Sequence, residues 1–133
     1  MLFLNPSQLS LLSIDLPDID SVSIDRLAHR EIVEWSDSGP FAIFADIPEV
    51  KVEITITQRL EREFTLAGPK PGEQGTLEFI ISPNASHAHR QKVSAQVVVR
   101  SIRNDLAAKP ERIISLAALS PNGATDPITF SDA

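Results

Sequence analysis

The chain has 133 residues, of which 42% are hydrophobic and 23% charged, and its formal net charge is −6. These values are typical of one soluble globular domain that can bury a core of its own. There is no cysteine, which excludes disulfides and thiolate chemistry, and no apolar run approaches the length of a membrane span.

The first predicted feature is an acidic segment. Between Asp15 and Glu49 nine acidic residues stand against two basic ones, Arg26 and Arg30, which is a net charge of −7. Nucleic-acid binding requires a basic footprint, so this balance argues against it. We interpret the segment either as a solvated region that maintains solubility, or as a surface that repels DNA or meets a basic partner. The start of the chain lacks a basic signal-peptide region, so we expect synthesis in the cytoplasm.

Short extended runs separated by ten prolines and five glycines predict a mainly β fold. We expect one β-rich domain over residues 1–133, with residues 1–20 as a candidate N-terminal arm. The sheet should be antiparallel, because the strands far outnumber the helices, and a β-sandwich or barrel follows. The predicted extended runs are Ser21–Leu27, His29–Trp35, Phe41–Ala45, Val50–Phe64, Thr76–Ser82, Lys92–Asn104, Arg112–Ser120 and Ile128–Phe130.

The run Val50–Phe64 is unusually long for a strand. Period-two alternation holds for fifteen residues, which is about 50 Å of extended chain at ~3.3 Å per residue. We expect a long β-hairpin in which its partner is either Thr76–Ser82, of about half its length, or Lys92–Asn104. The excess around Gln58–Phe64 would then leave an open edge that either is protected by its charges or pairs with another chain.

Two helices are expected. One runs over about residues 84–92, where Asn84 or Ser86 can cap it, and a weaker one lies over residues 6–13. Residues 67–75 hold two prolines and three glycines and are predicted to form a turn or an exposed loop, which would extend the strands outward as an arm.

No pattern in the sequence selects a catalytic site. His87 and His89 form an H-x-H pair, which we interpret as ordinary surface histidines because no third ligand is near. The acids from Asp15 to Asp25 lack the glycine and glutamate of a calcium loop. Nucleophile elbows and phosphate-binding loops are missing. We therefore expect no enzyme activity, no metal and no cofactor.

Three runs resemble the tail tube proteins of long-tailed bacteriophages. They are WSDSGPFAIFADIPEVKVEITITQRLERE, KPGEQGTLEFIISPNASHAHRQKVSAQVVV and RIISLAALSPNGATDPITF. The resemblance lies in the order of a long β-hairpin, a short helix, a closing strand and a turn. It covers about two-thirds of the chain and rests on no catalytic signature.

The resemblance implies a virion structural protein that self-assembles into hexameric rings stacked head to tail. DNA passes through the lumen during ejection without specific binding. Its partners would be copies of itself and the tape measure, terminator and baseplate proteins, with assembly in the bacterial cytoplasm and no membrane. The alternatives are a tail terminator, completion or baseplate ring protein, and, more distantly, a small β-sandwich that binds a ligand around Trp35.

Two sets of residues are candidates for these roles. Charged and polar residues near the long strand and the following loop are predicted to contact neighbouring subunits: Arg59, Glu61, Arg62, Glu63, Lys70, Glu73 and Gln74. The polar face of the long strand is predicted to face the lumen or solvent through Glu53, Thr55 and Thr57.

Overall fold

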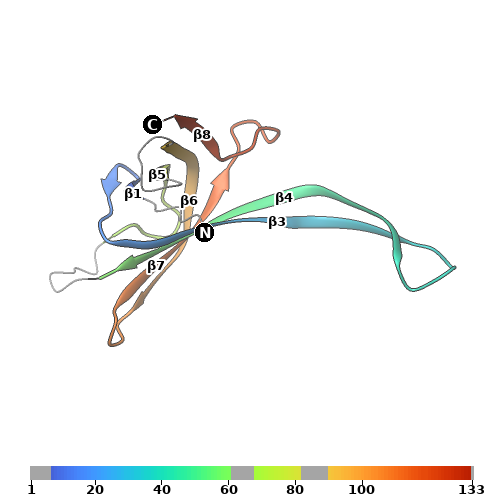
Figure 1. Cartoon of the computed structure of the whole chain (residues 1–133), viewed down its shortest axis with the longest axis horizontal. Coiled ribbons are helices and arrows are strands. Elements are labelled where there is room, and N and C mark those ends of the chain that lie inside the picture. The colour runs from blue at the N-terminus through green and yellow to red at the C-terminus, as the bar shows by residue number, and fades with distance from the viewer. Residues whose placement is uncertain (1–6, 61–67, 82–89, 133) are drawn as a thin grey trace.

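A computed structural model describes residues 7–60, 68–81 and 90–132. In this part of the chain eight strands form one antiparallel sheet with the order β2-β1-β5-β6-β7-β4-β3, and β8 pairs with β6 (Figure 1). The strands are β1 Ser7–Leu11, β2 Ile14–Asp15, β3 Ile19–Trp35, β4 Ala42–Arg59, β5 Gln74–Ile81, β6 Gln91–Asp105, β7 Glu111–Leu119 and β8 Thr129–Asp132. The prediction of a mainly β, antiparallel fold is therefore confirmed.

The helix expected over residues 84–92 is not found in its described part, residues 90–92. Residues 84–89 lie outside the described residues, and Gln91 and Lys92, at the end of the expected helix, begin β6 and pair with β5 and β8. The helix was predicted from a possible N-cap at Asn84 or Ser86, a signal that involves only neighbouring residues in the sequence. The alternation from Val93 onward is satisfied by ladder pairing on both sides, and that pairing determines the backbone of Gln91 and Lys92.

The weaker helix expected over residues 6–13 is also wrong in its described part. Ser7–Leu11 is β1, which pairs with β2 and β5, and the residues suggested as an N-terminal arm contribute β1 and β2 to the sheet. Leu9 and Leu11 are both buried, with the two-residue spacing of a strand. Burial of these two leucines on one face outweighs the weak helical propensity of the segment.

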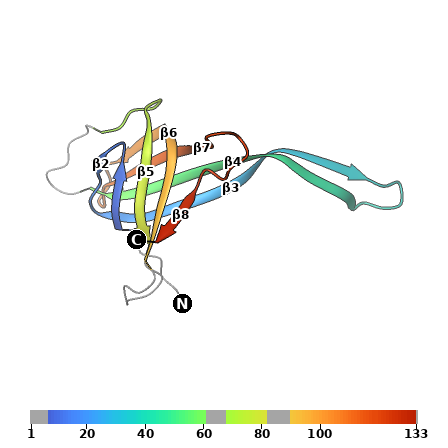
Figure 2. The same ribbon diagram turned by 90° about the horizontal axis from the view of Figure 1, so that it is seen from above.

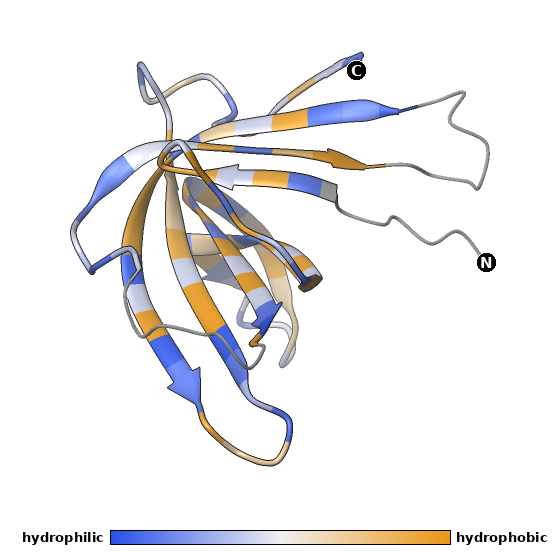
Figure 3. Ribbon diagram, turned by 90° about the vertical axis from the view of Figure 1, so that its left-hand side faces the viewer, coloured by the Kyte–Doolittle hydropathy of each residue, from blue (hydrophilic) through white to orange (hydrophobic). Residues whose placement is uncertain are grey.

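The core lies on one face of the strongly curved sheet. Leu9 and Leu11 of β1 belong to the same buried cluster as Ile54 and Ile56 of β4, although three strands, β5, β6 and β7, lie between β1 and β4 in the sheet order. The curvature brings these distant strands face to face, and apolar and polar residues alternate along each of them (Figure 3). Buried aliphatic side chains on the concave face stabilise the body of the protein by ~1.5–3 kcal/mol each.

The segment between β2 and β3 connects the two ends of the sheet. The Gln58 side chain donates a hydrogen bond of 2.9 Å to the carbonyl oxygen of Pro17, and the Arg59 amide donates one of 2.8 Å to that of Asp18. Leu16 beside them is buried in the core. These contacts hold the end of β4 against the entry to β3.

The pairing of the long strand differs from both predicted partners. β4 pairs with β3 from Ile19↔Gln58 to Trp35↔Ala42, whereas β5 pairs with β1 and β6. The preceding strand is the partner because it is 17 residues long and joined to β4 by a short turn. Register shifts on either side of Arg30 interrupt the period-two alternation of β3. The full length of β3 is therefore not visible as one pattern in the sequence.

The excess length of β4 lies at its N-terminal end. β7 pairs with β4 only from Glu53 to Arg59, so residues 42–52 have β3 as their sole partner among the described strands. At the other end an overhang was predicted over Gln58–Phe64, of which residues 61–64 lie outside the described residues. Gln58 pairs with both β3 and β7, Arg59 pairs with β7, and the Leu60 amide donates to the carbonyl of Pro110. The two-stranded ribbon of residues 27–51, here called the arm, projects away from the body (Figures 1 and 2).

Candidate subunit interface

The arm has two open edges among the described residues. β3 is the last strand of the sheet, and the part of β4 within the arm has no neighbour on its other side. An isolated two-stranded ribbon is at best marginally stable in water, and open edges invite pairing with another chain. The arm is therefore the part of the described fold that is most incomplete by itself.

The arm also exposes apolar side chains. Of the twelve exposed large hydrophobic residues in the described part of the chain, eight belong to the arm: Leu27, Ile32, Trp35, Phe41, Ile43, Phe44, Ile47 and Val50. Val33 is paired with Ala45 and Glu34 with Phe44, so apolar side chains occur on both faces of the ribbon. Such a concentration marks an interaction surface rather than scattered exposure.

Acidic residues accompany these apolar ones. Residues 31–49 contain five acids and neither lysine nor arginine, a net charge of −5 that accounts for most of the acidic segment seen in the sequence. The five are Glu31, Glu34, Asp37, Asp46 and Glu49. The His29 Nε2 atom lies 3.8 Å from the Glu49 carboxylate near the inner end of this stretch. The outer arm therefore presents apolar side chains within a negative field.

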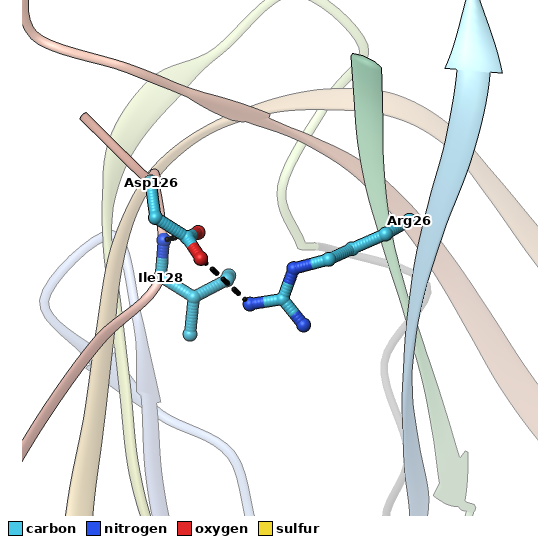
Figure 4. A network of polar contacts seen from close by, with 3 residues as sticks. All are labelled: Arg26, Asp126 and Ile128. Carbon is cyan, nitrogen blue, oxygen red and sulfur yellow. Dashed lines mark hydrogen bonds and ion pairs between the residues drawn. The ribbon is translucent and has the colours of Figure 1, made fainter. Parts of the chain in front are cut away.

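At the root of the arm, β3 contacts the loop between β7 and β8. Nη2 of Arg26 lies 3.0 Å from Oδ2 of Asp126, and Oδ1 of Asp126 accepts a hydrogen bond of 3.0 Å from the Ile128 amide (Figure 4). The Ile128 amide, followed by the Arg26 guanidinium, holds the pKa of Asp126 below its ordinary value of 3.8. The buried side chain of Ile128 anchors this loop in the core.

The loop itself is ordered by side chains of its own. Oδ1 of Asn122 accepts hydrogen bonds from the amides of Ala124 and Thr125, at 2.9 and 2.8 Å, and the Ser120 hydroxyl oxygen accepts one from Gly123. Gly123 has φ +81°, a conformation that glycine adopts without strain. These bonds account for the turn predicted at Asn122-Gly123.

Between this loop and the arm root lies a groove of about 640 Å³. Its lining includes Val50, Val52 and Ala118, which are apolar, and Arg26, His29 and Lys51, which are basic or titratable. The groove opens where β7 leaves β4, since Glu53↔Ala117 is the last pair of that ladder. Val50 is 61% exposed although it continues the core-facing alternation of Val52 and Ile54.

The predicted lumen or solvent residues lie on the opposite face of β4 from the core. Glu53, Thr55 and Thr57 are half-buried and alternate with buried Val52, Ile54 and Ile56, as the sequence pattern predicted. Their neighbours in the adjacent strands are mostly small or hydroxylated: Ser21, Ser23, Asp25, Ile113, Ser115 and Ala117. The cross-strand pairs therefore make this face of the sheet mainly polar.

Glu53 is the centre of the charges on this face. Its carboxylate lies 2.8 Å from Nζ of Lys51 and also pairs with Arg100, which reaches from β6 past β7. The hydrogen bond from Lys51 is the main cause that lowers the pKa of Glu53; burial opposes it, and the charges of Arg100 and Lys51 add to it. Glu53 is therefore ionised at neutral pH.

The predicted interface residues are dispersed. Arg59 is exposed and forms an ion pair of 2.9 Å with Asp20, whereas Glu61, Arg62 and Glu63 lie outside the described residues. Lys70, Glu73 and Gln74 are exposed in a turn at the start of β5. This turn is not an outward arm, as the sequence suggested, because the Gly72 amide donates to the carbonyl of Val99 and the Val99 amide to that of Glu73.

The sequence predicted a partner surface in this region only through the acidic charge of residues 15–49 and through Trp35, and it did not identify the apolar residues Phe41 to Val50 as interface candidates. The sequence does contain a signal for an exposed apolar surface, because acidic residues occur among Phe41, Ile43 and Phe44. Pro48, however, predicts a strand boundary at a point that lies inside β4. Pro48 lies where the β3–β4 ladder shifts register, between Arg30↔Glu49 and Ile32↔Asp46, and an irregularity of this kind tolerates a residue without an amide donor.

Within the described residues, no group of three or more histidine, aspartate or glutamate side chains could hold a metal ion. The same part of the chain contains no helix long and apolar enough to cross a membrane. His87 and His89 lie outside the described residues. No known family model matches the sequence, and no curated protein is significantly similar to it.

Proposed function

We propose that this protein is the structural subunit of a phage tail tube, which self-assembles into stacked rings and performs no catalysis. The observation that carries the proposal is the arm, a long two-stranded ribbon that is open at both edges and rich in exposed apolar side chains. A monomer gains nothing from exposing Phe41, Ile43 and Val50 to water. Burying such side chains against other copies contributes ~25 cal/mol per Å² of apolar surface.

The resemblance to tail tube proteins supplies the kind of assembly. In the proposed tube, six copies form a ring in which neighbouring sheets join into a sandwich- or barrel-like wall, and rings stack head to tail. The tape measure, terminator and baseplate proteins complete the tail, which is assembled in the bacterial cytoplasm and becomes part of the virion.

The polar face of β4 is the proposed lumen wall. Glu53, Thr55 and Thr57, with the hydroxylated neighbours on β3 and β7, form a surface without exposed large apolar side chains among the described residues. Lys51 and Arg100 both pair with Glu53, and Arg59, which follows Thr57 on this face, pairs with Asp20, which reduces the attraction of these three cations for DNA phosphates. Weak contact with phosphates would let DNA pass without specific binding.

Electron microscopy of the purified full-length protein over a range of concentrations tests the proposal. Stacked rings or tubes are the expected result. The matched control replaces residues 29–49 by Asn-Gly, which joins the cross-strand partners Ala28 and Val50 by a two-residue hairpin turn. This variant should fold around the same core and remain monomeric.

Single rings that never stack would favour the tail terminator or baseplate alternative. A wild-type protein that stays monomeric at every concentration would exclude the tube. The ligand-binding alternative has little support, because Trp35 is 64% exposed at the outer end of β3 rather than inside a concave site.

A further inference from the structure

The loop between β7 and β8 contains the dipeptide Asn122-Gly123, the only asparagine in the sequence that is followed by glycine. Both residues are exposed, and the loop forms one side of the groove at the arm root. Asparagine is a thermolabile residue, because the amide nitrogen of the next residue can attack its side-chain carboxamide. Glycine in the next position favours this attack, since it has no Cβ atom to hinder the approach.

The reaction of this pair needs only water. The Gly123 nitrogen loses its proton to hydroxide and forms a bond with Cγ of Asn122. The bond from Cγ to Nδ2 then breaks, and Nδ2 takes up protons and leaves as ammonia, which regenerates hydroxide. The product is a five-membered imide. Water opens the imide at one of its two carbonyl carbons and leaves either aspartate or isoaspartate, and both products add one negative charge to the loop.

The folded loop engages both reacting groups in other bonds. The Gly123 amide donates a hydrogen bond of 3.0 Å to the Ser120 hydroxyl oxygen, so its proton is already held. Oδ1 of Asn122 accepts bonds of 2.9 and 2.8 Å from the amides of Ala124 and Thr125. Moving Cγ to bonding distance of the Gly123 nitrogen displaces Oδ1 from these two amides. The imide therefore forms only after the loop has opened.

The far end of the loop is held as well. Oδ1 of Asp126 accepts the bond from the Ile128 amide, and Oδ2 pairs with Arg26 on β3. Ile128 is buried in the core. Opening of the loop is therefore opposed at one end by the Ser120 and Asn122 bonds and at the other by this anchor.

We propose that Asn122 is a self-modification site and that opening of the folded loop sets the rate of its modification. This inference goes beyond the proposed function and does not depend on assembly. In the isoaspartate product the main chain runs through Cγ, so the oxygen that bound the amides of Ala124 and Thr125 is lost from its place. The modification is therefore a one-way change that keeps the loop open beside the arm root.

The experiment compares the folded loop with the same sequence in an unfolded peptide. Trypsin cleaves after Arg112, and residues 113–133 contain neither lysine nor arginine and have Asn122 as their only asparagine. The intact protein, at a concentration that keeps it monomeric, and the isolated peptide are incubated together at mildly alkaline pH. The protein is then digested briefly, so mass spectrometry measures deamidation and isoaspartate in the same peptide for both samples.

Three variants complete the experiment. Ser120→Ala removes the acceptor of the Gly123 amide but leaves the Asn-Gly pair intact. Ser120→Thr is its matched control, because threonine keeps the hydroxyl group. Asn122→Gln extends the side chain by one methylene, which disfavours the five-membered ring, and it should therefore show almost no product.

The peptide should react at least about tenfold faster than the folded protein, because more than one hydrogen bond must break in the loop. In the folded protein Ser120→Ala should react about 2- to 12-fold faster than wild type, the effect of losing one hydrogen bond. Ser120→Thr should react like wild type. The peptides of wild type and both Ser120 variants should react at one common rate.

Every other result overturns the proposal. A folded protein that reacts as fast as its peptide would show that the loop does not control the reaction. A Ser120→Ala protein that reacts at the wild-type rate would show the same. A peptide that stays unmodified would show that Asn122 is no modification site. Each of these results leaves the tube proposal unaffected, because all the rates are measured on the monomer.

Discussion

Arg26 and Asp126 are 100 positions apart in the sequence, yet their side chains meet at 3.0 Å. This ion pair joins the root of the arm to the loop before β8, and Asp126 also accepts the hydrogen bond from the Ile128 amide. The direction in which the arm leaves the body is therefore coupled to a loop whose last residues enter the core.

Asp126 offers a test of this coupling. Asp126→Asn keeps an oxygen for the Ile128 amide and loses only an exposed ion pair, so we expect the free energy of unfolding to fall by less than about 1 kcal/mol. Asp126→Ala also loses the hydrogen bond, which adds ~0.5–1.5 kcal/mol. Urea denaturation at neutral pH measures both variants.

The pH dependence of the Asp126 contribution has a defined sign. The pKa of Asp126 in the folded protein lies below its ordinary value of 3.8, so the stability from its charge is fully present above pH 3.8 and is lost as the pH falls through the folded-state pKa. The difference between wild type and Asp126→Asn should close in acid. An unchanged difference there would show that the charge does not matter.

Two isoleucines of β4 should respond differently to the same change. Ile54 is fully buried, so Ile54→Ala should lower the free energy of unfolding of the monomer by ~2–5 kcal/mol. Ile43 is 67% exposed, so Ile43→Ala should change it by no more than about 0.5 kcal/mol. Calorimetry at concentrations that keep the protein monomeric measures both, and equal losses would mean that the arm is packed against the body.

Hydrogen exchange should divide β4 into two parts. Amides between Glu53 and Arg59 lie between β3 and β7 and should exchange slowly, whereas those between Ala42 and Val50 belong to a two-stranded ribbon and should exchange faster in the monomer. Assembly should slow exchange in the arm selectively. A mass-spectrometric time course below and above the assembly concentration records this, and uniform protection along β4 in the monomer would contradict the isolation of the arm.

Gly75 has a close neighbour that a side chain would meet. A Cβ atom there would clash with Cδ2 of Leu12 and lie 3.3 Å from its Cα, so Gly75→Ala should force Leu12 to move at a cost of ~1–3 kcal/mol. Gly39→Ala in the turn of the arm is the control, because nothing lies within 4 Å of the added atom. Urea titration that finds both variants as stable as wild type would mean that Leu12 moves freely.

Much of the fold was predictable where it depends on neighbouring residues. The alternation of Val52, Ile54 and Ile56 with Glu53, Thr55 and Thr57 predicted which side chains are buried. The run Arg112–Ser120, apolar on both faces, predicted a central strand, and β7 lies between β4 and β6. The short run at Ile128–Phe130 predicted an edge strand, which is found as β8, shifted by one or two residues.

The candidate site was less predictable. The prediction of contacts at residues 59–63 and 70–74 depends on pairing the long strand with the segments that follow it, whereas its partner in the arm precedes it. Pro48 interrupts the alternation that would indicate a strand along the arm. Val50 shows that alternation within a strand does not always predict which side chains are buried. Its alternation assigns it to the core, but β7 has already left β4 at Glu53, so most of its side chain stays exposed.

Period-two alternation and composition were enough to establish the β character of the chain, the core face of its strands and the acidic charge of the region that forms the arm. These properties involve residues close together in the chain, so they can be recognised without the fold. The three-dimensional structure was needed to establish that β4 pairs with β3 and β7, that its excess lies at Ala42–Val52, and that Arg26 meets Asp126 beside a groove. Strand order results from competition among pairings between distant segments, and no local pattern encodes which pairing wins.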